Sequence, residues 1–259
     1  MKNSKIIKDV LVFNFASGEK TKELSEYCFR KLNYENIITI NDKTGFTDKF
    51  KKCAEIAVNS KYEVFIRTDA DRLVFDGIDT LVENFKNDKV DCAEGLGHEY
   101  FMNCFRGATP HVFSRRVFEL LYENNDLMPD VQKPENFFIA NLVNSGLIKE
   151  KTYKILTNLH EYEQLPSKVC NSIQNRIARG HLGYYNFDYL NSLKKYSEAI
   201  KYAISNYSEK KSMDHYDYSF LDKGFLEKDS NKSLESLYLK HERIYRELLK
   251  KYDEQEVTR

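Results

Sequence analysis

The chain has 259 residues, 41% of them hydrophobic and 14% aromatic, which is enough for one domain with an extension. Its 40 basic and 40 acidic residues balance, and this neutrality argues against a protein built mainly to coat nucleic acid. The five cysteines are scattered without a C-x-x-C pair, and no apolar stretch approaches the roughly 20 residues that span a bilayer. We therefore expect a cytoplasmic protein with reduced thiols and no transmembrane segment.

Apolar strands and amphipathic helices alternate at the start of the chain. Strands are predicted over residues 8–16, 36–40 and 62–67, and helices over residues 20–32 and 47–59. A β-α-β-α-β order favours parallel strands joined by right-handed crossovers. The pattern therefore predicts an α/β fold with an open, mainly parallel sheet flanked by helices.

The pattern is less regular further along the chain. From about residue 166 the strand signals stop, so we divide the chain into an α/β domain over residues 1–165 and a helical C-terminal extension over residues 166–259. The last helix has an apolar stripe, and we expect it to brace the sheet or to mediate a homo-oligomer contact. In the later part of the α/β domain we predict strands at 90–95, 99–105, 109–114 and 153–156, and helices at 78–85, 114–124 and 134–146.

Acidic residues follow two of the predicted parallel strands. Asp42 comes after the second strand, and Asp69 and Asp71 form a D-x-D motif after the third. Ligands of open α/β sheets bind outside the carboxyl ends of the strands. Two carboxylates there can hold Mg²⁺ or Mn²⁺, which would offset the charge that builds on a departing nucleoside diphosphate. A turn whose acids cap the next helix explains the same residues, so both interpretations stay open.

The segment VFIRTDADRLV, with the preceding INDKTGFTDKFKKCAEIAVNSKYE, resembles the donor-binding half of GT-A glycosyltransferases of the broad family-two type. The resemblance covers residues 8–165 in the order of elements, although FASG stands where that group carries a proline-asparagine segment. It implies that Asp42 contacts the nucleobase or ribose of a nucleotide-sugar donor. It also implies that Asp69 and Asp71 hold Mn²⁺ or Mg²⁺ at the donor diphosphate. Lys51, on the intervening helix, is a further donor-binding candidate.

The same resemblance implies a third metal ligand and a general base. GT-A enzymes often take a histidine ligand from a late strand end, and His160 follows the predicted strand YKIL. An inverting transferase needs an acid that accepts the proton of the acceptor hydroxyl. Family-two enzymes place this acid at the start of a helix, where Glu135 stands, with Asp130 close behind. A surface histidine and a first-turn acid favoured by the helix dipole are the plain alternatives for these positions.

Three functions are compatible with these residues. The resemblance favours a metal-dependent glycosyltransferase that moves a sugar from a nucleotide sugar to a hydroxyl acceptor, such as a glycan or another polymer. Nucleotidyl transfer also uses an α/β sheet with acidic metal ligands, but usually with a Gly-rich basic loop after the first strand. The segment ASGEK resembles such a loop only weakly. A non-catalytic α/β binding protein requires only that the D-x-D motif caps a helix.

Overall fold

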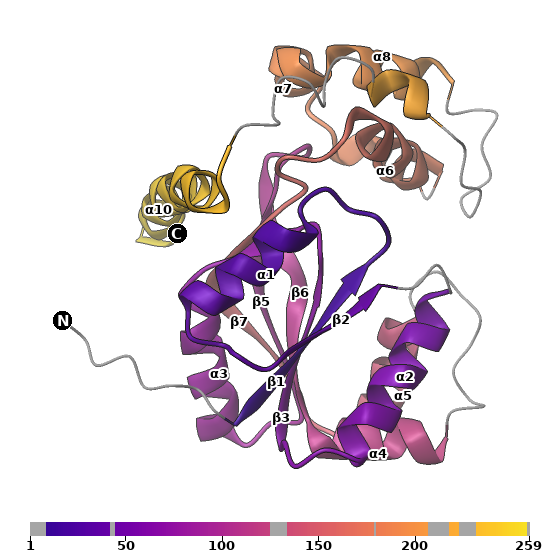
Figure 1. Ribbon diagram of the computed structural model, residues 1–259, viewed down its shortest axis with the longest axis vertical. Coiled ribbons are helices and arrows are strands. Elements are labelled where there is room, and N and C mark those ends of the chain that lie inside the picture. Colours follow the sequence, from indigo (N-terminus) through magenta and orange to yellow (C-terminus); the bar gives the residue numbers. More distant parts are fainter. Residues whose placement is uncertain are drawn as a thin grey trace.

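The computed structural model describes residues 9–41, 45–124, 134–178, 180–206, 218–222 and 232–257. In these segments the strands form one sheet in the order β2-β1-β3-β6-β5-β7-β4, and helices cover both of its faces (Figure 1). The strands are β1 (Val10–Ala16), β2 (Ile37–Asn41), β3 (Val64–Asp69), β4 (Arg72–Val74), β5 (Cys92–Glu99), β6 (Cys104–Ser114) and β7 (Glu150–His160). The α-helices are α1 (Lys22–Lys31), α2 (Phe46–Val58), α3 (Gly77–Asp88), α4 (Arg115–Glu123), α5 (Pro134–Asn144), α6 (Pro166–Ala178), α7 (Phe187–Ser192), α8 (Ser197–Ser205) and α10 (Leu234–Val257).

The predicted α/β fold class, an open sheet flanked by helices, is confirmed. Strands β2, β1 and β3 run parallel, and β5 and β7 are parallel to each other. Strand β6 runs antiparallel to both β3 and β5, and the short β4 runs antiparallel to β7. The parallel half of the sheet brings the carboxyl ends of β1, β2 and β3 to one edge.

The sequence predicts two strands over residues 99–105 and 109–114, but residues 100–103 form the turn after β5 and residues 104–114 form one continuous strand, β6. That prediction is wrong because Gly107 does not interrupt the strand. A Cβ atom at this position would lie 2.7 Å from Oε1 of Glu94 on β5, so glycine leaves room for the end of the Glu94 side chain.

Alternate residues of β1 face two separate apolar layers. Leu11, Phe13 and Phe15 pack with side chains of α2, α4 and α5, whereas Val10 and Val12 pack with those of α1 and α3. Because both faces of the strand are covered, its sequence is an apolar run interrupted only by Asn14, rather than an alternating one.

The helices after β7 pack in two places. Helices α6, α7 and α8 lie together beyond the sheet (Figure 1) and share an apolar core with Phe101 and Met102 of the turn between β5 and β6. Helix α10 packs against α1 and β7, where Tyr245 stacks on Phe75 at 4.6 Å and donates a hydrogen bond to the Leu156 carbonyl at 2.8 Å. The last helix is thus a brace. A homo-oligomer contact and the domain boundary at residue 165 stay predictions.

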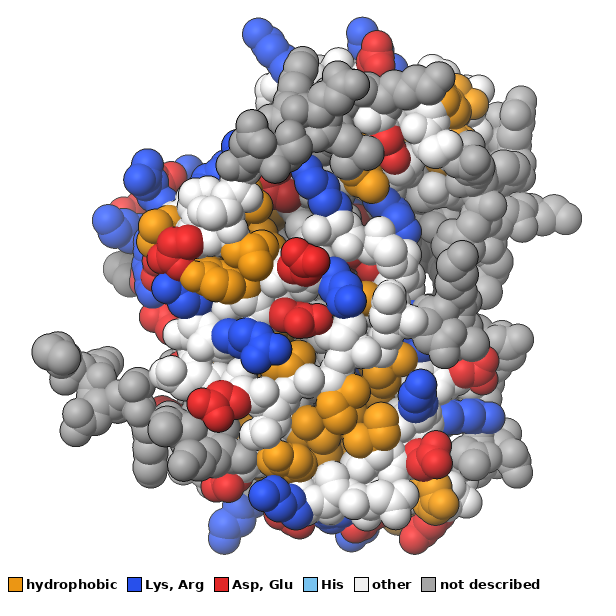
Figure 2. Space-filling model, viewed as in Figure 1, with side chains coloured by type: hydrophobic (Ala, Val, Ile, Leu, Met, Phe, Trp, Pro, Cys, Tyr) orange, Lys and Arg blue, Asp and Glu red, His pale blue; other side chains and the backbone are white. Residues whose placement is uncertain are grey.

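The surface mixes charges of both signs. In the view of Figure 2, Lys and Arg side chains alternate with Asp and Glu, and hydrophobic side chains gather over the sheet edge that β2 forms. The five cysteines are free thiols, and four of them are buried. Across the described segments, no helix is both long and apolar enough to cross a bilayer.

Asp79 in the first turn of α3 gives the fold a pH dependence. Burial raises its pKa from 3.8 to about 6, although the Tyr34 hydroxyl donates a hydrogen bond to it at 2.9 Å. An acid whose folded-state pKa is raised destabilises the fold once it ionises, so stability falls as pH rises from about 4 to about 6. We expect Asp79→Asn to remove this loss and to raise the free energy of unfolding near pH 7 by roughly 1 kcal/mol. Urea denaturation across this pH range measures the free energy of unfolding of the wild type and of Asp79→Asn. Equal pH profiles for these two proteins would contradict the raised pKa of Asp79.

Candidate functional site

The D-x-D motif lies at the carboxyl end of β3, in a turn fixed on both sides. The Ala70 amide donates a hydrogen bond to the Phe15 carbonyl of β1 at 2.8 Å. The Thr21 hydroxyl, just before α1, donates one to the Ala70 carbonyl at 2.7 Å. The side chains of Asp69 and Asp71 keep 24% and 26% of their surface exposed, so both remain accessible at this edge of the sheet.

Strand β4 brings His160 to the motif. It begins directly after Asp71 and pairs Arg72 with His160 of β7, while β5 pairs Glu99 with the same histidine from the other side. As a result His160 Nε2 lies 3.2 Å from Asp71 Oδ2, and Nδ1 lies 2.7 Å from Glu99 Oε2. Two of the candidate metal ligands, 89 residues apart in the sequence, therefore meet.

Glu99 is fully buried and surrounded by positive charge. Arg176 of α6 donates to its Oε2 at 3.0 Å, and Arg106 and Arg72 lie 3.2 Å and 3.7 Å from its Oε1. Burial by itself would raise the pKa of Glu99, but the charges of His160 and the arginines hold it well below its ordinary value. The Glu99 carboxylate is therefore ionised at neutral pH.

His160 and Asp71 titrate as partners. Burial and the nearby Arg72 oppose protonation of the imidazole, but Glu99 and Asp71 outweigh them and raise the pKa of His160 to about 9. Burial likewise opposes ionisation of Asp71, but His160 outweighs it and lowers the pKa of Asp71 to about 2. A metal ion that binds Nε2 must displace a proton from this ring.

Asp69 is held by different neighbours from those of Asp71. Arg67 donates to its Oδ1 at 2.8 Å, and the Thr109 hydroxyl of β6 donates to its Oδ2 at 3.1 Å. The guanidinium of Arg67 lies over the rings of Phe15 and Phe46, at 4.7 Å and 5.1 Å from their centroids. These contacts fix the direction in which the Asp69 carboxylate points.

Arg67 also connects the motif to Glu135. This acid lies in the first turn of α5, and its Oε1 is 4.0 Å from Nη1 of Arg67. Its Oε2 is buried and has no hydrogen-bond partner among the described residues. Arg67 thus forms ion pairs with both Asp69 and the predicted base, Glu135. Asp42 and Asp130 lie outside the described residues.

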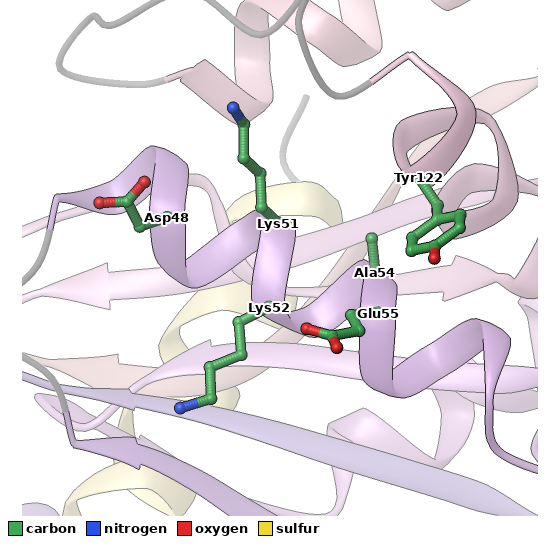
Figure 3. A pocket seen from close by; sticks show the side chains of 6 residues that line it. All are labelled: Asp48, Lys51, Lys52, Ala54, Glu55 and Tyr122. Carbon is green, nitrogen blue, oxygen red and sulfur yellow. The ribbon is translucent and has the colours of Figure 1, made fainter.

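Lys51 lies apart from this cluster. It lines a cavity of about 340 Å³ on the outer side of α2, with Tyr122 of α4 at the rim (Figure 3). The lysine of α2 that reaches the strand ends is Lys49, which is 3% exposed and donates to the Ala16 carbonyl at 3.2 Å. The helical period explains the difference, because positions 49 and 51 point to different sides of one helix.

The residues around Asp71 fit a divalent cation. Its Oδ1 atom is buried and has no hydrogen-bond partner in the described part of the chain. Carboxylate oxygens and an imidazole nitrogen are ligands that Mn²⁺ and Mg²⁺ accept. Glu99, His160 and Glu161 also lie within 4.8 Å of one another, but Glu99 and Glu161 are already paired with arginines. The Oδ1 atom of Asp71, in contrast, has no such arginine partner among the described residues.

Sequence reasoning missed Arg67, Arg72 and Glu99. The signal for the arginines is present in VFIRTDADRLV, where both flank the motif inside apolar strands. A buried guanidinium requires an acidic partner, so these positions indicate ion pairs with nearby carboxylates. Glu99 carries no such local signal.

Comparisons with known proteins give distant similarities. No protein-family model and no curated protein matches the chain. Among solved structures, A197 from STIV is 11% identical, with a TM-score of 0.46 over 60% of this chain and 86% of that one. A putative glucose-1-phosphate thymidylyltransferase from Bacillus anthracis is 12% identical, with a TM-score of 0.40 over 57% and 88%. A glycosyltransferase involved in the glycosylation of the major capsid of PBCV-1 is 11% identical, with a TM-score of 0.38 over 58% and 92%.

Proposed function

We propose that this protein is a metal-dependent glycosyltransferase that moves a sugar from a nucleotide sugar to a hydroxyl acceptor. The observation that carries the proposal is the meeting of His160 Nε2 and Asp71 Oδ2 at 3.2 Å, beside an Asp71 oxygen without a hydrogen-bond partner among the described residues. Asp69, at the end of β3 and two residues before Asp71, would supply the second carboxylate.

Asp69, Asp71 and His160 would hold Mn²⁺ or Mg²⁺ in this site. When bound, the ion supplies positive charge for the diphosphate that leaves the sugar. Lys168 of α6 donates to the Ser17 carbonyl at 2.9 Å, and Lys49 donates to the Ala16 carbonyl. Both ammonium groups therefore lie at the end of β1, where they can attract the phosphates of the donor.

Glu135 is the base in this proposal. Arg67 links it to Asp69, and its buried Oε2 can take the proton of the acceptor hydroxyl. We expect Glu135→Gln to lower kcat by about 100-fold while metal-dependent donor binding stays unchanged. Glu119→Gln, at an exposed position of α4, is the matched control and should keep full activity. A kcat for Glu135→Gln equal to that of the wild type would remove Glu135 from the mechanism.

The proposal is tested by offering nucleotide sugars to the wild-type protein with Mn²⁺, with Mg²⁺ and with a chelator. Thermal stability and donor hydrolysis are measured for each. At least one nucleotide sugar should raise the melting temperature and be hydrolysed to the nucleoside diphosphate only when a metal is present. No metal-dependent shift with any nucleotide or nucleotide sugar would overturn the proposal.

Nucleotidyl transfer is the second candidate. The observation that favours it is the pair Lys49 and Lys168 at the loop after β1, which supplies the basic character that this loop lacks in sequence. The products decide between the two. A nucleotidyltransferase joins a nucleoside triphosphate to a sugar phosphate and releases pyrophosphate. A glycosyltransferase releases a nucleoside diphosphate from a nucleotide sugar.

A further inference from the structure

The two ring nitrogens of His160 have different environments. Nδ1 lies 2.7 Å from Oε2 of Glu99, inside the protein, and Nε2 points toward Asp71 at the accessible strand end. Once Nε2 has lost its proton, a histidine that donates its Nδ1 proton to a carboxylate presents the lone pair of Nε2 to a metal. The contact with Glu99 therefore selects the tautomer and the ring orientation that a metal at Asp71 requires.

Glu99 is itself fixed by charge pairing. Its side chain has no exposed surface, and Arg72, Arg106 and Arg176 lie within 3.7 Å of its two oxygens. Gly97, on the same strand, makes room for Arg72 and its partner Asn158, since a Cβ atom there would lie 2.8 Å from Oδ1 of Asn158 and 3.1 Å from Nη1 of Arg72. An ionised carboxylate held from several sides cannot turn away from the histidine.

Arg176 joins this pair to the helical extension. It lies on α6 and contacts Glu99 at 3.0 Å through one terminal nitrogen and Glu161 at 2.8 Å through the other. Glu161 follows His160 directly and has a positive φ of 63°, a conformation that is costly for a residue with a side chain. Its amide donates to the Asp71 carbonyl at 3.0 Å. The extension thus holds the backbone between His160 and α6.

We propose that Glu99 and Arg176 are positioning residues for the metal site: Glu99 orients His160, and Arg176 fixes Glu99 and the loop after His160 from the helical extension. This inference rests on the proposed metal site at Asp71. It gives α6 a role in the site, because without Arg176 the Oε2 atom of Glu99 would lose its guanidinium partner.

Mn²⁺ affinity measured by electron paramagnetic resonance tests the inference without any substrate. Loss of an outer partner of a metal-bound histidine typically weakens binding by 10-fold to 100-fold. We expect Glu99→Ala to weaken Mn²⁺ binding within about that range, and Glu99→Gln to weaken it less, because an amide oxygen still accepts the Nδ1 proton. Arg176→Met should weaken it by about 10-fold.

Glu163→Gln is the matched control. Glu163 lies in the same loop, is buried, and also has a positive φ, but its partners are Lys195, Lys240 and His241. It should leave Mn²⁺ affinity unchanged. If Glu99→Ala does not fold, as judged by circular dichroism, the glutamine variant decides the test.

A spectroscopic signature separates positioning from direct ligation. Bound Mn²⁺ in the wild type should show spin-echo modulation from a histidine nitrogen, and Glu99→Ala should lose this modulation while Asp69 and Asp71 still hold the ion. Unchanged affinity and modulation in the Glu99 and Arg176 variants would overturn the inference and leave the proposed function intact. A Glu99→Ala protein that binds no Mn²⁺, like Asp71→Ala, would make Glu99 a ligand and overturn its positioning role. A wild-type protein that binds no Mn²⁺ would overturn both proposals.

Discussion

Asp71→Asn is expected to weaken metal-dependent binding of the nucleotide sugar by about 100-fold or more, with the fold intact. The substitution keeps the shape of the side chain but removes its charge. The buried Oδ1 has no hydrogen-bond partner in the described segments, and Oδ2 faces His160, so either oxygen is placed to bind the ion. An amide would offer one neutral oxygen and point an NH₂ group at the metal or at the histidine. Titration of donor with and without Mn²⁺, followed by fluorescence or calorimetry, measures the loss.

Asp76→Asn is the matched control for Asp71→Asn. Asp76 occupies the N-cap position of α3 and pairs with Arg246 at the surface, and β4 separates it from Asp71. We expect unchanged donor binding and a stability change of less than about 1 kcal/mol. The same comparison tests the helix-cap interpretation of the motif. The acid at the start of α3 is Asp76, whereas Asp71 is not at a helix terminus. Metal-dependent donor binding by Asp71→Asn at the wild-type level would exclude Asp71 as a ligand.

Gly77→Ala is expected to destabilise the fold by more than about 3 kcal/mol. Gly77 opens α3 where this helix crosses β7, and a Cβ atom there would lie 1.9 Å from the Leu156 carbonyl oxygen and 2.9 Å from the Tyr245 hydroxyl. The first of these atoms belongs to a strand backbone and cannot move aside alone. The helix would have to shift away from the sheet, and Tyr245 of α10 would lose its hydrogen bond to Leu156. Chemical denaturation monitored by circular dichroism measures the effect.

Gly183→Ala provides the comparison for Gly77→Ala. A Cβ atom at Gly183 would meet nothing within 4 Å, and its backbone is not in the left-handed region. We expect a change within about 0.5 kcal/mol. Equal denaturation midpoints for Gly77→Ala and the wild type would mean that α3 does not approach β7 as closely as the structure places it.

The periodicity of the sequence was sufficient for the local elements of the first half. The apolar runs over residues 8–16 and 62–67 became β1 and β3, and the alternation of strands and helices gave the parallel pairing between them. The same pattern placed Asp69 at the end of a buried strand. These features depend on residues that are near one another in the chain, so a local pattern can reveal them.

Strand β4 is an element that the local sequence pattern did not predict. It has three residues, Arg72–Val74, and its ladder hydrogen bonds come from residues 158–160 of β7. A segment this short has no period of its own, and it becomes a strand because a distant partner satisfies its backbone groups. Its pairing is what places His160 beside Asp71.

By itself, the sequence determined the α/β class, the strand that the D-x-D motif ends, and the helical character of the C-terminal part. Only the tertiary structure decided which nitrogen of His160 faces Asp71, which carboxylate holds the other nitrogen, and that Lys49 rather than Lys51 reaches the strand ends. The physical reason is that secondary structure follows from the spacing of apolar residues along the chain. The direction of a buried charge depends on partners that come from distant strands and helices, as Glu99 and Arg176 do for His160.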